Sequence, residues 1–254
     1  GPPSRTGDSP RLLLRPFRLT GMKLSLIVPA YNEIATIAEI IRQVLGAPIE
    51  IPKELIIVDD GSRDGTREYL ENLVRHEGSG GEVKVLFHER NQGKGAAIRT
   101  AIPHVTGEIV LIQDADLEYD PRDYAMLLQP VLDGRADVVF GNRFHGGPHR
   151  VLYFWHFVGN RLLTTLCNMV TNLNLTDMEV GYKVFRAEIL KKIQLRSNRF
   201  GFEPEIVIKV AKRGCRIYEV PISYHGRTYA EGKKITWRDG LAAFFHIIRY
   251  RFFD

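Results

Sequence analysis

The sequence predicts an α/β fold in which helices flank a mostly parallel sheet, followed by a C-terminal extension. Two observations support this: from Lys23 onward short apolar runs alternate with amphipathic stretches, and polar residues follow the apolar runs directly. Such alternation is typical of βαβ units, whose parallel strands are covered on both faces. A chain of 254 residues, 44% hydrophobic and 26% charged, has room for one large domain or two small ones, and this composition excludes disordered and fibrous proteins.

The expected elements alternate regularly through the first 140 residues. Short apolar runs predict strands over residues 24–28, 55–58, 83–87, 109–112 and 137–140. The amphipathic stretches between them predict helices over residues 34–45, 66–74, 95–105 and 123–132.

The pattern loosens after Gly141. The remaining predicted elements are a Gly/Pro/His loop over 145–149, helices over 155–171 and 204–212, strands over 182–185 and 215–220, a polar loop over 224–234 and an amphipathic helix over 237–252. No internal repeat or low-complexity linker divides the chain. We therefore interpret residues 23–234 as one domain with halves 23–140 and 141–234, followed by a helical segment, 235–254. Residues 1–22 are expected to be a tag remnant or flexible segment.

The net charge of +5 is the sum of two opposite halves. Residues 1–140 carry 16 Lys+Arg and 21 Asp+Glu, whereas residues 141–254 carry 19 and 9. Halves of opposite charge indicate two different ligands. Cys167 and Cys215 have no metal-type spacing, which disfavours a disulfide framework or a Cys-based zinc site and fits a reducing compartment. No window reaches the roughly 18–20 apolar residues of a membrane-spanning helix.

Acidic residues follow two of the predicted strands, at the edge where parallel sheets bind ligands. Asp114 and Asp116 have i, i+2 spacing, which directs both carboxylates to one face of an extended chain. Converging carboxylates favour Mg²⁺ or Mn²⁺, and Glu118 is a candidate third ligand. The alternative is a solvated turn, and Asp59 and Asp60 before Gly61 have a similar alternative as turn initiators.

Two further short motifs have structural explanations. Asp64-Gly65-Thr66 predicts a turn and a helix cap. Gly93-Lys94-Gly95 opens a predicted helix, where backbone N–H groups can hold an anion, although a plain helix start explains it equally well.

Together these segments resemble the family-2 glycosyltransferases with a GT-A fold, and within them the polyprenyl- and dolichyl-phosphate sugar synthases. The resemblance covers about residues 23–234 and weakens after Gly141. Its motifs are, in order, Val-Pro-Ala-Tyr-Asn-Glu at 28–33, Val-Asp-Asp-Gly-Ser-Arg-Asp-Gly-Thr at 58–66, Asn-Gln-Gly-Lys-Gly at 91–95, Asp-Ala-Asp-Leu at 114–117 and Gly-Asn-Arg at 141–143.

The resemblance implies a donor site in the first half of the chain. The nucleoside would be held by Pro29, Ala30, Tyr31, Glu33 and Asp60, with Asp59 in support. Gly93, Lys94 and the Asp114-Ala115-Asp116 segment would lie against the nucleotide. Asp114, Asp116 and Glu118 would bind Mg²⁺ or Mn²⁺ on the diphosphate.

The resemblance also implies an acceptor site in the basic half. Arg143 and Arg161 match acceptor-phosphate ligands, and Arg227, Lys233 and Lys234 match a loop that closes on the donor diphosphate. A surface charge explains Arg161 equally well, and a solvated turn explains Lys233-Lys234.

Two acidic positions also match the family. Asp177 occupies a family position, although Glu179-Val180 departs from the small polar residues expected after it. Glu205 matches a helix acid, for which a salt bridge is as good an explanation as catalysis.

The resulting expectation is inverting, metal-dependent transfer of a hexose from GDP-mannose, UDP-glucose or UDP-GlcNAc to dolichyl or undecaprenyl phosphate. A phosphate acceptor needs no general base, whereas a hydroxyl acceptor, the main alternative, would use Asp177 or Glu179. A noncatalytic sugar-nucleotide-binding protein is a further alternative. Nucleic acid is not an expected partner, and the sequence indicates no oligomeric state.

A lipid acceptor implies peripheral contact with the cytoplasmic face of a membrane. The candidate surfaces are residues 151–157 and the C-terminal helix, where aromatic and aliphatic residues alternate with Arg249 and Arg251. The alternative is that these apolar residues pack on the sheet, because core helices show the same periodicity.

Overall fold

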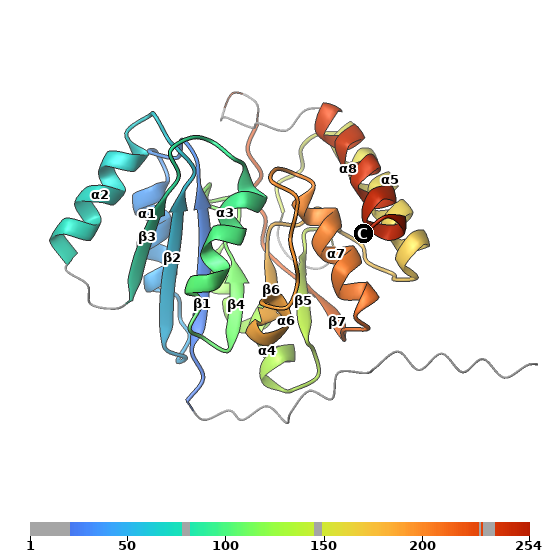
Figure 1. Ribbon diagram of the computed structural model, residues 1–254, viewed down its shortest axis with the longest axis horizontal. Coiled ribbons are helices and arrows are strands. Elements are labelled where there is room, and N and C mark those ends of the chain that lie inside the picture. The colour runs from blue at the N-terminus through green and yellow to red at the C-terminus, as the bar shows by residue number, and fades with distance from the viewer. Residues whose placement is uncertain (1–20, 78–81, 145–148, 229, 231–236) are drawn as a thin grey trace, which may run out of the picture.

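The computed structural model describes residues 21–77, 82–144, 149–228, 230 and 237–254, which form a seven-stranded sheet with helices around it (Figure 1). The order of the strands is β3-β2-β1-β4-β6-β5-β7. Their bounds are β1 Leu24–Ala30, β2 Lys53–Asp59, β3 Val83–Phe87, β4 Ile109–Ile112, β5 Val138–Asn142, β6 Lys183–Arg186 and β7 Ile217–Pro221. The predicted α/β class and each predicted strand are confirmed.

Four strands of the first half are parallel, with β1 between β2 and β4. Leu26 of β1 pairs with Leu55 on one side and Leu111 on the other, and all three are buried. Continuous apolar strands of this kind are expected where both faces of a parallel sheet are covered.

Strand β6 runs antiparallel to both of its neighbours, β4 and β5. Lys183, its first residue, pairs with Ile112 at the end of β4 and with Phe140 of β5. The segment that precedes β6 therefore reaches the sheet at the edge where β4 and β5 end. Residues 177–182 share that edge with the polar residues that follow β1 and β4.

The helices agree with the predicted pattern, with local differences. Their bounds are α1 Ile37–Leu45, α2 Thr66–Glu77, α3 Lys94–Ala101, α4 Tyr124–Leu132, α5 Phe154–Thr171, α6 Ala187–Leu190, α7 Phe202–Lys212 and α8 Trp237–Phe252, with short 3₁₀ turns at η1 Ile102–His104 and η2 Pro121–Asp123. The helix expected over 95–105 ends at Ala101 because Pro103 lies in the following 3₁₀ turn. The four-residue helix α6 was not predicted, since it is little more than one helical turn and cannot show a repeated hydrophobic pattern.

Helices α5, α7 and α8 pack against one another on the β7 side of the molecule, while α2 lies beside β3 at the other edge (Figure 1). Helix α8 has two faces. Ala243, Ile247 and Tyr250 are buried, whereas Phe244 and Phe245 are exposed. The buried face packs on α5 and α7, and membrane contact of the exposed face stays a prediction. Within the described part of the chain, no helix is long and apolar enough to cross a membrane.

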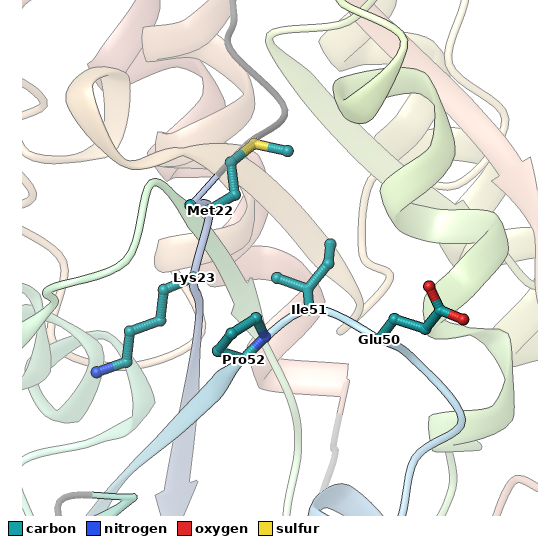
Figure 2. A pocket seen from close by; sticks show the side chains of 6 residues that line it. Met22, Lys23, Glu50, Ile51 and Pro52 are labelled. Carbon is teal, nitrogen blue, oxygen red and sulfur yellow. The ribbon is translucent and has the colours of Figure 1, made fainter.

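A pocket at the opposite end of the sheet is lined by residues before β1 and β2 (Figure 2). Met22 and Lys23 lie on one side of it, and Glu50, Ile51 and Pro52 on the other. Ligands of open α/β sheets bind outside the carboxyl ends of the strands. The candidate site therefore lies at the carboxyl ends of the strands.

Candidate active site

Carboxylates and cations from distant parts of the sequence meet where β1 and β4 end. Lys94 Nζ, at the start of α3, lies 2.7 Å from Asp114 Oδ1 and 3.1 Å from Glu203 Oε1. Arg227 Nη2 lies 2.8 Å from Asp116 Oδ2, and its Nη1 lies 3.3 Å from Glu33 Oε2. The structure thus brings together six side chains, of which five lie at predicted site positions and one, Glu203, was not predicted. We call Glu33, Asp114, Asp116 and Glu118 the carboxylate cluster.

The surroundings of Asp116 disfavour its negative charge. Burial, followed by the charges of Asp114 and Glu118, raises the pKa of Asp116 to about 7, while Arg227 opposes the rise. Lys94 shows the reverse balance: burial would lower its pKa, but Asp114 and Glu203 outweigh burial and raise it. A carboxylate cluster in this condition has a strong affinity for cations.

Glu118, the candidate third metal ligand, holds a loop of the basic half. Its Oε1 accepts the backbone N–H of Arg227 at 2.8 Å, and its Oε2 accepts the Tyr224 hydroxyl at 3.0 Å. Within the described residues, no three His, Cys, Asp or Glu side chains are arranged to hold a metal ion. Asp114 and Asp116 nevertheless fit Mg²⁺ or Mn²⁺, because these ions are commonly held by one or two carboxylates with phosphate oxygens completing the shell.

Asp59 and Asp60, predicted beside the nucleoside, hold the loops that shape this edge. Both are buried. Asp60 accepts the backbone N–H of Gly93 at 2.7 Å and that of Gln92 at 2.9 Å, and lies 2.7 Å from His88 Nδ1. Asp59 accepts the N–H of Ser62, and lies 3.8 Å from Arg67. A role in nucleoside binding stays a prediction for Asp60, as it does for Pro29, Ala30 and Tyr31 at the end of β1.

The turn before Lys94 requires glycine. Gly93 has a φ of 104°, and a Cβ at this position would overlap the carbonyl oxygen of Asn198. A side chain is therefore excluded both by backbone conformation and by space. This turn starts α3 at Lys94, which places the ammonium group beside Asp114.

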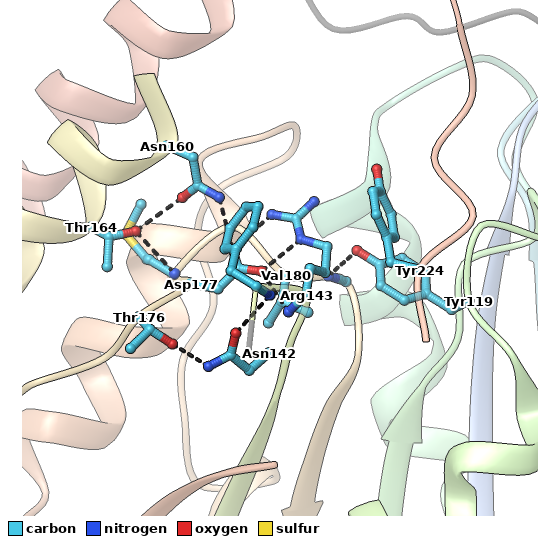
Figure 3. A network of polar contacts seen from close by, with 12 residues as sticks. Tyr119, Asn142, Arg143, Asn160, Thr164, Thr176, Asp177, Val180 and Tyr224 are labelled. Carbon is cyan, nitrogen blue, oxygen red and sulfur yellow. Dashed lines mark hydrogen bonds and ion pairs between the residues drawn. The ribbon is translucent and has the colours of Figure 1, made fainter. Parts of the chain in front are cut away.

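A second network lies at the end of β5 and is shown in Figure 3. Arg143 Nε lies 2.6 Å from Asp177 Oδ2 and Nη2 lies 2.7 Å from Asp177 Oδ1. Asn160 of α5 donates to Asp177 Oδ1 at 2.8 Å, and Thr164 donates to Asn160 at 2.9 Å. Burial would raise the pKa of Asp177, but the charge of Arg143 and the hydrogen bonds from Arg143 and Asn160 together outweigh burial and hold this pKa below its usual value.

Tyr224 connects the two networks. Its ring lies 5.1 Å from the Arg143 guanidinium carbon (Figure 3). Its hydroxyl donates to Glu118. Tyr119 packs against the same ring at 5.5 Å, and its hydroxyl accepts the backbone N–H of Gly181. The carboxylate cluster and the Arg143–Asp177 pair are therefore parts of one continuous site.

Arg161 is not brought into this site. It lies on the exposed face of α5, and its side chain makes no ion pair with the residues that the structure describes. Lys233 and Lys234 lie outside the described residues. Their predicted roles stay predictions.

Sequence reasoning selected Glu205 on α7, but Glu203 is the acid that reaches Lys94. Glu205 accepts the backbone N–H groups of Arg196 and Ser197, both at 2.7 Å, and pairs with Lys209 at 2.8 Å. The structural alternative therefore describes Glu205. Glu203, Tyr224 and Asn160 were missed because no local pattern distinguishes them from surface or core residues.

Comparison with known proteins identifies the family. The model for glycosyl transferase family 2 matches residues 25–194. Glycosyltransferase AglJ of Haloferax volcanii is 30% identical over 226 residues, which cover 88% of this chain and 70% of the relative. The dodecaprenyl-phosphate galacturonate synthase of Rhizobium johnstonii is 29% identical over 217 residues, which cover 84% of this chain but only 62% of the relative's length.

A solved structure shows the same fold. Glucosyl-3-phosphoglycerate synthase from Mycobacterium tuberculosis, in complex with Mn²⁺, UDP and phosphoglyceric acid, has a TM-score of 0.70 at 20% identity, and the match covers 92% of this chain and 80% of that one. The predicted GT-A architecture is thereby confirmed. The chain belongs to glycosyltransferase family 2.

Proposed function

We propose that the protein transfers a hexose from a nucleotide sugar to a polyprenyl phosphate, with inversion and with a divalent cation at the donor diphosphate. The observation that carries this proposal is the continuous site in which Tyr224 joins the carboxylate cluster to the Arg143–Asp177 pair. One part suits a metal-bound diphosphate and the other a second anion. The printed name of the Rhizobium relative, a dodecaprenyl-phosphate synthase, supports a polyprenyl phosphate as that anion.

The chain's own residues can position a phosphate acceptor without removing a proton. A phosphate monoester oxygen is already anionic at neutral pH, so the attack needs alignment and charge control. Asp177 engages Nε and Nη2 of Arg143, which leaves Nη1 to meet the incoming phosphate. Asp177 thus acts as a positioning residue that fixes the guanidinium plane.

The opposite end of the site accommodates the leaving group. A cation held by Asp114 and Asp116 would neutralise the charge that develops on the departing nucleoside diphosphate. Lys94 and Arg227 add two positive side chains at the same place. Glu33 follows β1, beside the position expected for the nucleoside.

The exposed helices fit contact with the membrane in which a polyprenyl acceptor lies. Trp155 of α5 is 77% exposed and Phe245 of α8 is 69% exposed. We call six of the exposed apolar residues of these two adjacent helices the apolar face: Phe154, Trp155, Leu162, Leu241, Phe245 and Phe252. Large exposed apolar patches mark interaction surfaces, and the neighbouring Arg249 and Arg251 suit anionic lipid headgroups. The proposal places this face on the cytoplasmic side of a membrane.

A hydroxyl acceptor is the second candidate, because the site contains a carboxyl group suited to act as a base. Burial, followed by the charge of Glu203, raises the pKa of Glu179 to about 8. Its Oε1 is buried and has no hydrogen-bond partner among the described residues. Glu179 therefore replaces Asp177 as the better candidate base, since the low pKa and the bidentate pairing of Asp177 disfavour proton removal.

Product partitioning distinguishes the two candidates. The protein is incubated with Mn²⁺, a radiolabelled sugar nucleotide and either a polyprenyl phosphate or a saccharide acceptor. Donors include GDP-mannose, UDP-glucose, UDP-GlcNAc and a UDP-uronic acid. Label in the organic phase only with the lipid phosphate supports the proposal, and product only with the hydroxyl acceptor contradicts it. Asp116→Ala should abolish turnover, whereas Asp133→Ala, at an exposed pair with Arg135, should not.

A further inference from the structure

Arg227 holds the carboxylate cluster together from a position far away in the sequence. Its three guanidinium nitrogens lie 2.8 Å from Asp116, 3.3 Å from Glu33 and 3.4 Å from Glu118. The side chain is 21% exposed. A planar fork that contacts three carboxylates is a geometry that lysine cannot reproduce.

Each of the two aspartates that fit a metal ion has its own cationic side chain. Asp114 is paired with Lys94, and Asp116 with Arg227. Together the two side chains carry the same charge as one divalent cation. A cation that binds Asp116 must therefore compete with the Arg227 guanidinium for Oδ2, and it must overcome the attraction between Arg227 and Glu33 as well.

The backbone at Arg227 is anchored separately from its guanidinium group. The Arg227 N–H donates to Glu118 Oε1 at 2.8 Å, and Tyr224 donates to the other oxygen of the same carboxylate. The guanidinium group can thus change partners while the backbone stays in place. The partner that suits a bidentate guanidinium beside a metal-bound carboxylate pair is a diphosphate.

We infer that Arg227 couples the binding of the divalent cation to the binding of the nucleoside diphosphate, by competing with the cation for Asp116 and exchanging that carboxylate for the diphosphate. This inference rests on the proposed function, because it requires a nucleotide-sugar donor at the carboxylate cluster. Either ligand alone binds against electrostatic repulsion. Arg227 repels the cation, and the carboxylates repel the diphosphate. Each ligand should therefore increase the affinity for the other by the same factor, which is commonly about 5–150-fold.

The coupling is measured as the affinity of the full chain for Mn²⁺, without nucleotide and with saturating UDP or GDP. Electron paramagnetic resonance of the free ion monitors the binding. We expect the nucleotide to increase the Mn²⁺ affinity of the unmodified protein about tenfold or more. Arg227→Gln should bind Mn²⁺ alone about tenfold more tightly and show a smaller nucleotide effect than the unmodified protein, because only the direct contact between phosphate oxygens and the cation then remains. Arg227→Lys keeps the charge but not the fork, and should give intermediate values.

Arg122→Gln is the matched control for a change in net charge. Arg122 is 80% exposed and pairs with Asp120, outside the carboxylate cluster. The Arg122→Gln variant should show the same Mn²⁺ affinities, with and without nucleotide, as the unmodified protein. The inference is overturned if both Arg227 variants bind Mn²⁺ alone with unchanged affinity while UDP or GDP still increases it by the original factor. If the unmodified protein binds Mn²⁺ under neither condition, the donor assignment of the proposed function fails and this inference fails with it.

Discussion

Arg143 and Asp177 form a bidentate ion pair, with distances of 2.6 and 2.7 Å, that joins the end of β5 to the segment before β6. Asp177 is fully buried, and the Arg143 side chain is 13% exposed. The pair is therefore shielded from the solvent that weakens surface ion pairs. Removing either partner should therefore cost more stability than removing one partner of an exposed ion pair.

Breaking this pair should destabilise the fold. Asp177→Asn leaves the Arg143 charge buried without a counter-charge, and we expect the free energy of unfolding to fall by about 3–5 kcal/mol. Urea denaturation measures the change. Asp133→Asn removes one partner of an exposed pair with Arg135 and should cost no more than about 1 kcal/mol. Equal losses in the two variants would contradict the prediction.

The buried carboxyl group of Glu179 should make stability depend on pH. Burial raises its pKa from 4.5 to about 8. Between these values the folded protein keeps a proton that the unfolded chain releases, so the contribution of this group to stability falls as the pH rises. Glu179→Gln should remove this decline, which amounts to on the order of 1 kcal/mol per pH unit. Denaturation at pH 5 to 8 measures it, with Glu89→Gln, at an exposed residue, as the control for the charge change. Parallel curves for Glu179→Gln and the unmodified protein would refute it.

Gly181 leaves the space that the Asp114 carboxylate occupies. A Cβ on Gly181 would overlap Asp114 Oδ2 and approach the Tyr119 ring to 2.7 Å. Gly181→Ala should therefore displace the carboxylate and reduce turnover by on the order of 100-fold.

Gly159→Ala is the control for this glycine replacement. No atom lies within 4 Å of the added Cβ inside α5, so this variant should retain activity and gain up to about 1 kcal/mol of stability. Rate assays and urea denaturation check both variants. Full activity of Gly181→Ala would show that Asp114 has no fixed position.

The apolar face should bind lipid. Replacing Trp155 and Phe245 together with serine should reduce co-sedimentation with anionic phospholipid vesicles about tenfold or more, because two large side chains no longer enter the bilayer. Folding should be little affected, since both side chains are exposed. Val74→Ser with Met126→Ser changes two exposed apolar residues on α2 and α4 and should leave binding intact. An unmodified protein that does not sediment with such vesicles would exclude this surface as a membrane contact.

The fold was largely predictable because most of its signals are local. Continuous apolar runs identify strands such as Ile109–Ile112, whose four residues are all buried. The direction of β6 was not predictable, because a four-residue run has the same pattern in a parallel and an antiparallel strand. The end of α3 at Ala101 had a visible signal in Pro103, whereas α6 had none.

The site was predictable where a motif spans consecutive residues. Asp114, Asp116 and Lys94 lie together as their motifs indicate. Glu203 was not predictable, because its contact with Lys94 joins residues more than 100 positions apart. Asp60 is the opposite case. Its motif is clear in the sequence, but in the structure its oxygens accept backbone N–H groups of Gln92 and Gly93.

The reversed direction of β6 has a consequence for how such a chain can diversify. Residues 177–182 lie beside the candidate site and lead into β6, a strand that shares no hydrogen bonds with β1, β2 or β3. Insertions or exchanges before Gly181 are therefore expected to remodel the proposed acceptor side of the site while β1 and β2 keep their register. We expect that a graft of residues 177–180 from a relative, with Gly181 retained, would change what receives the sugar without displacing Asp114.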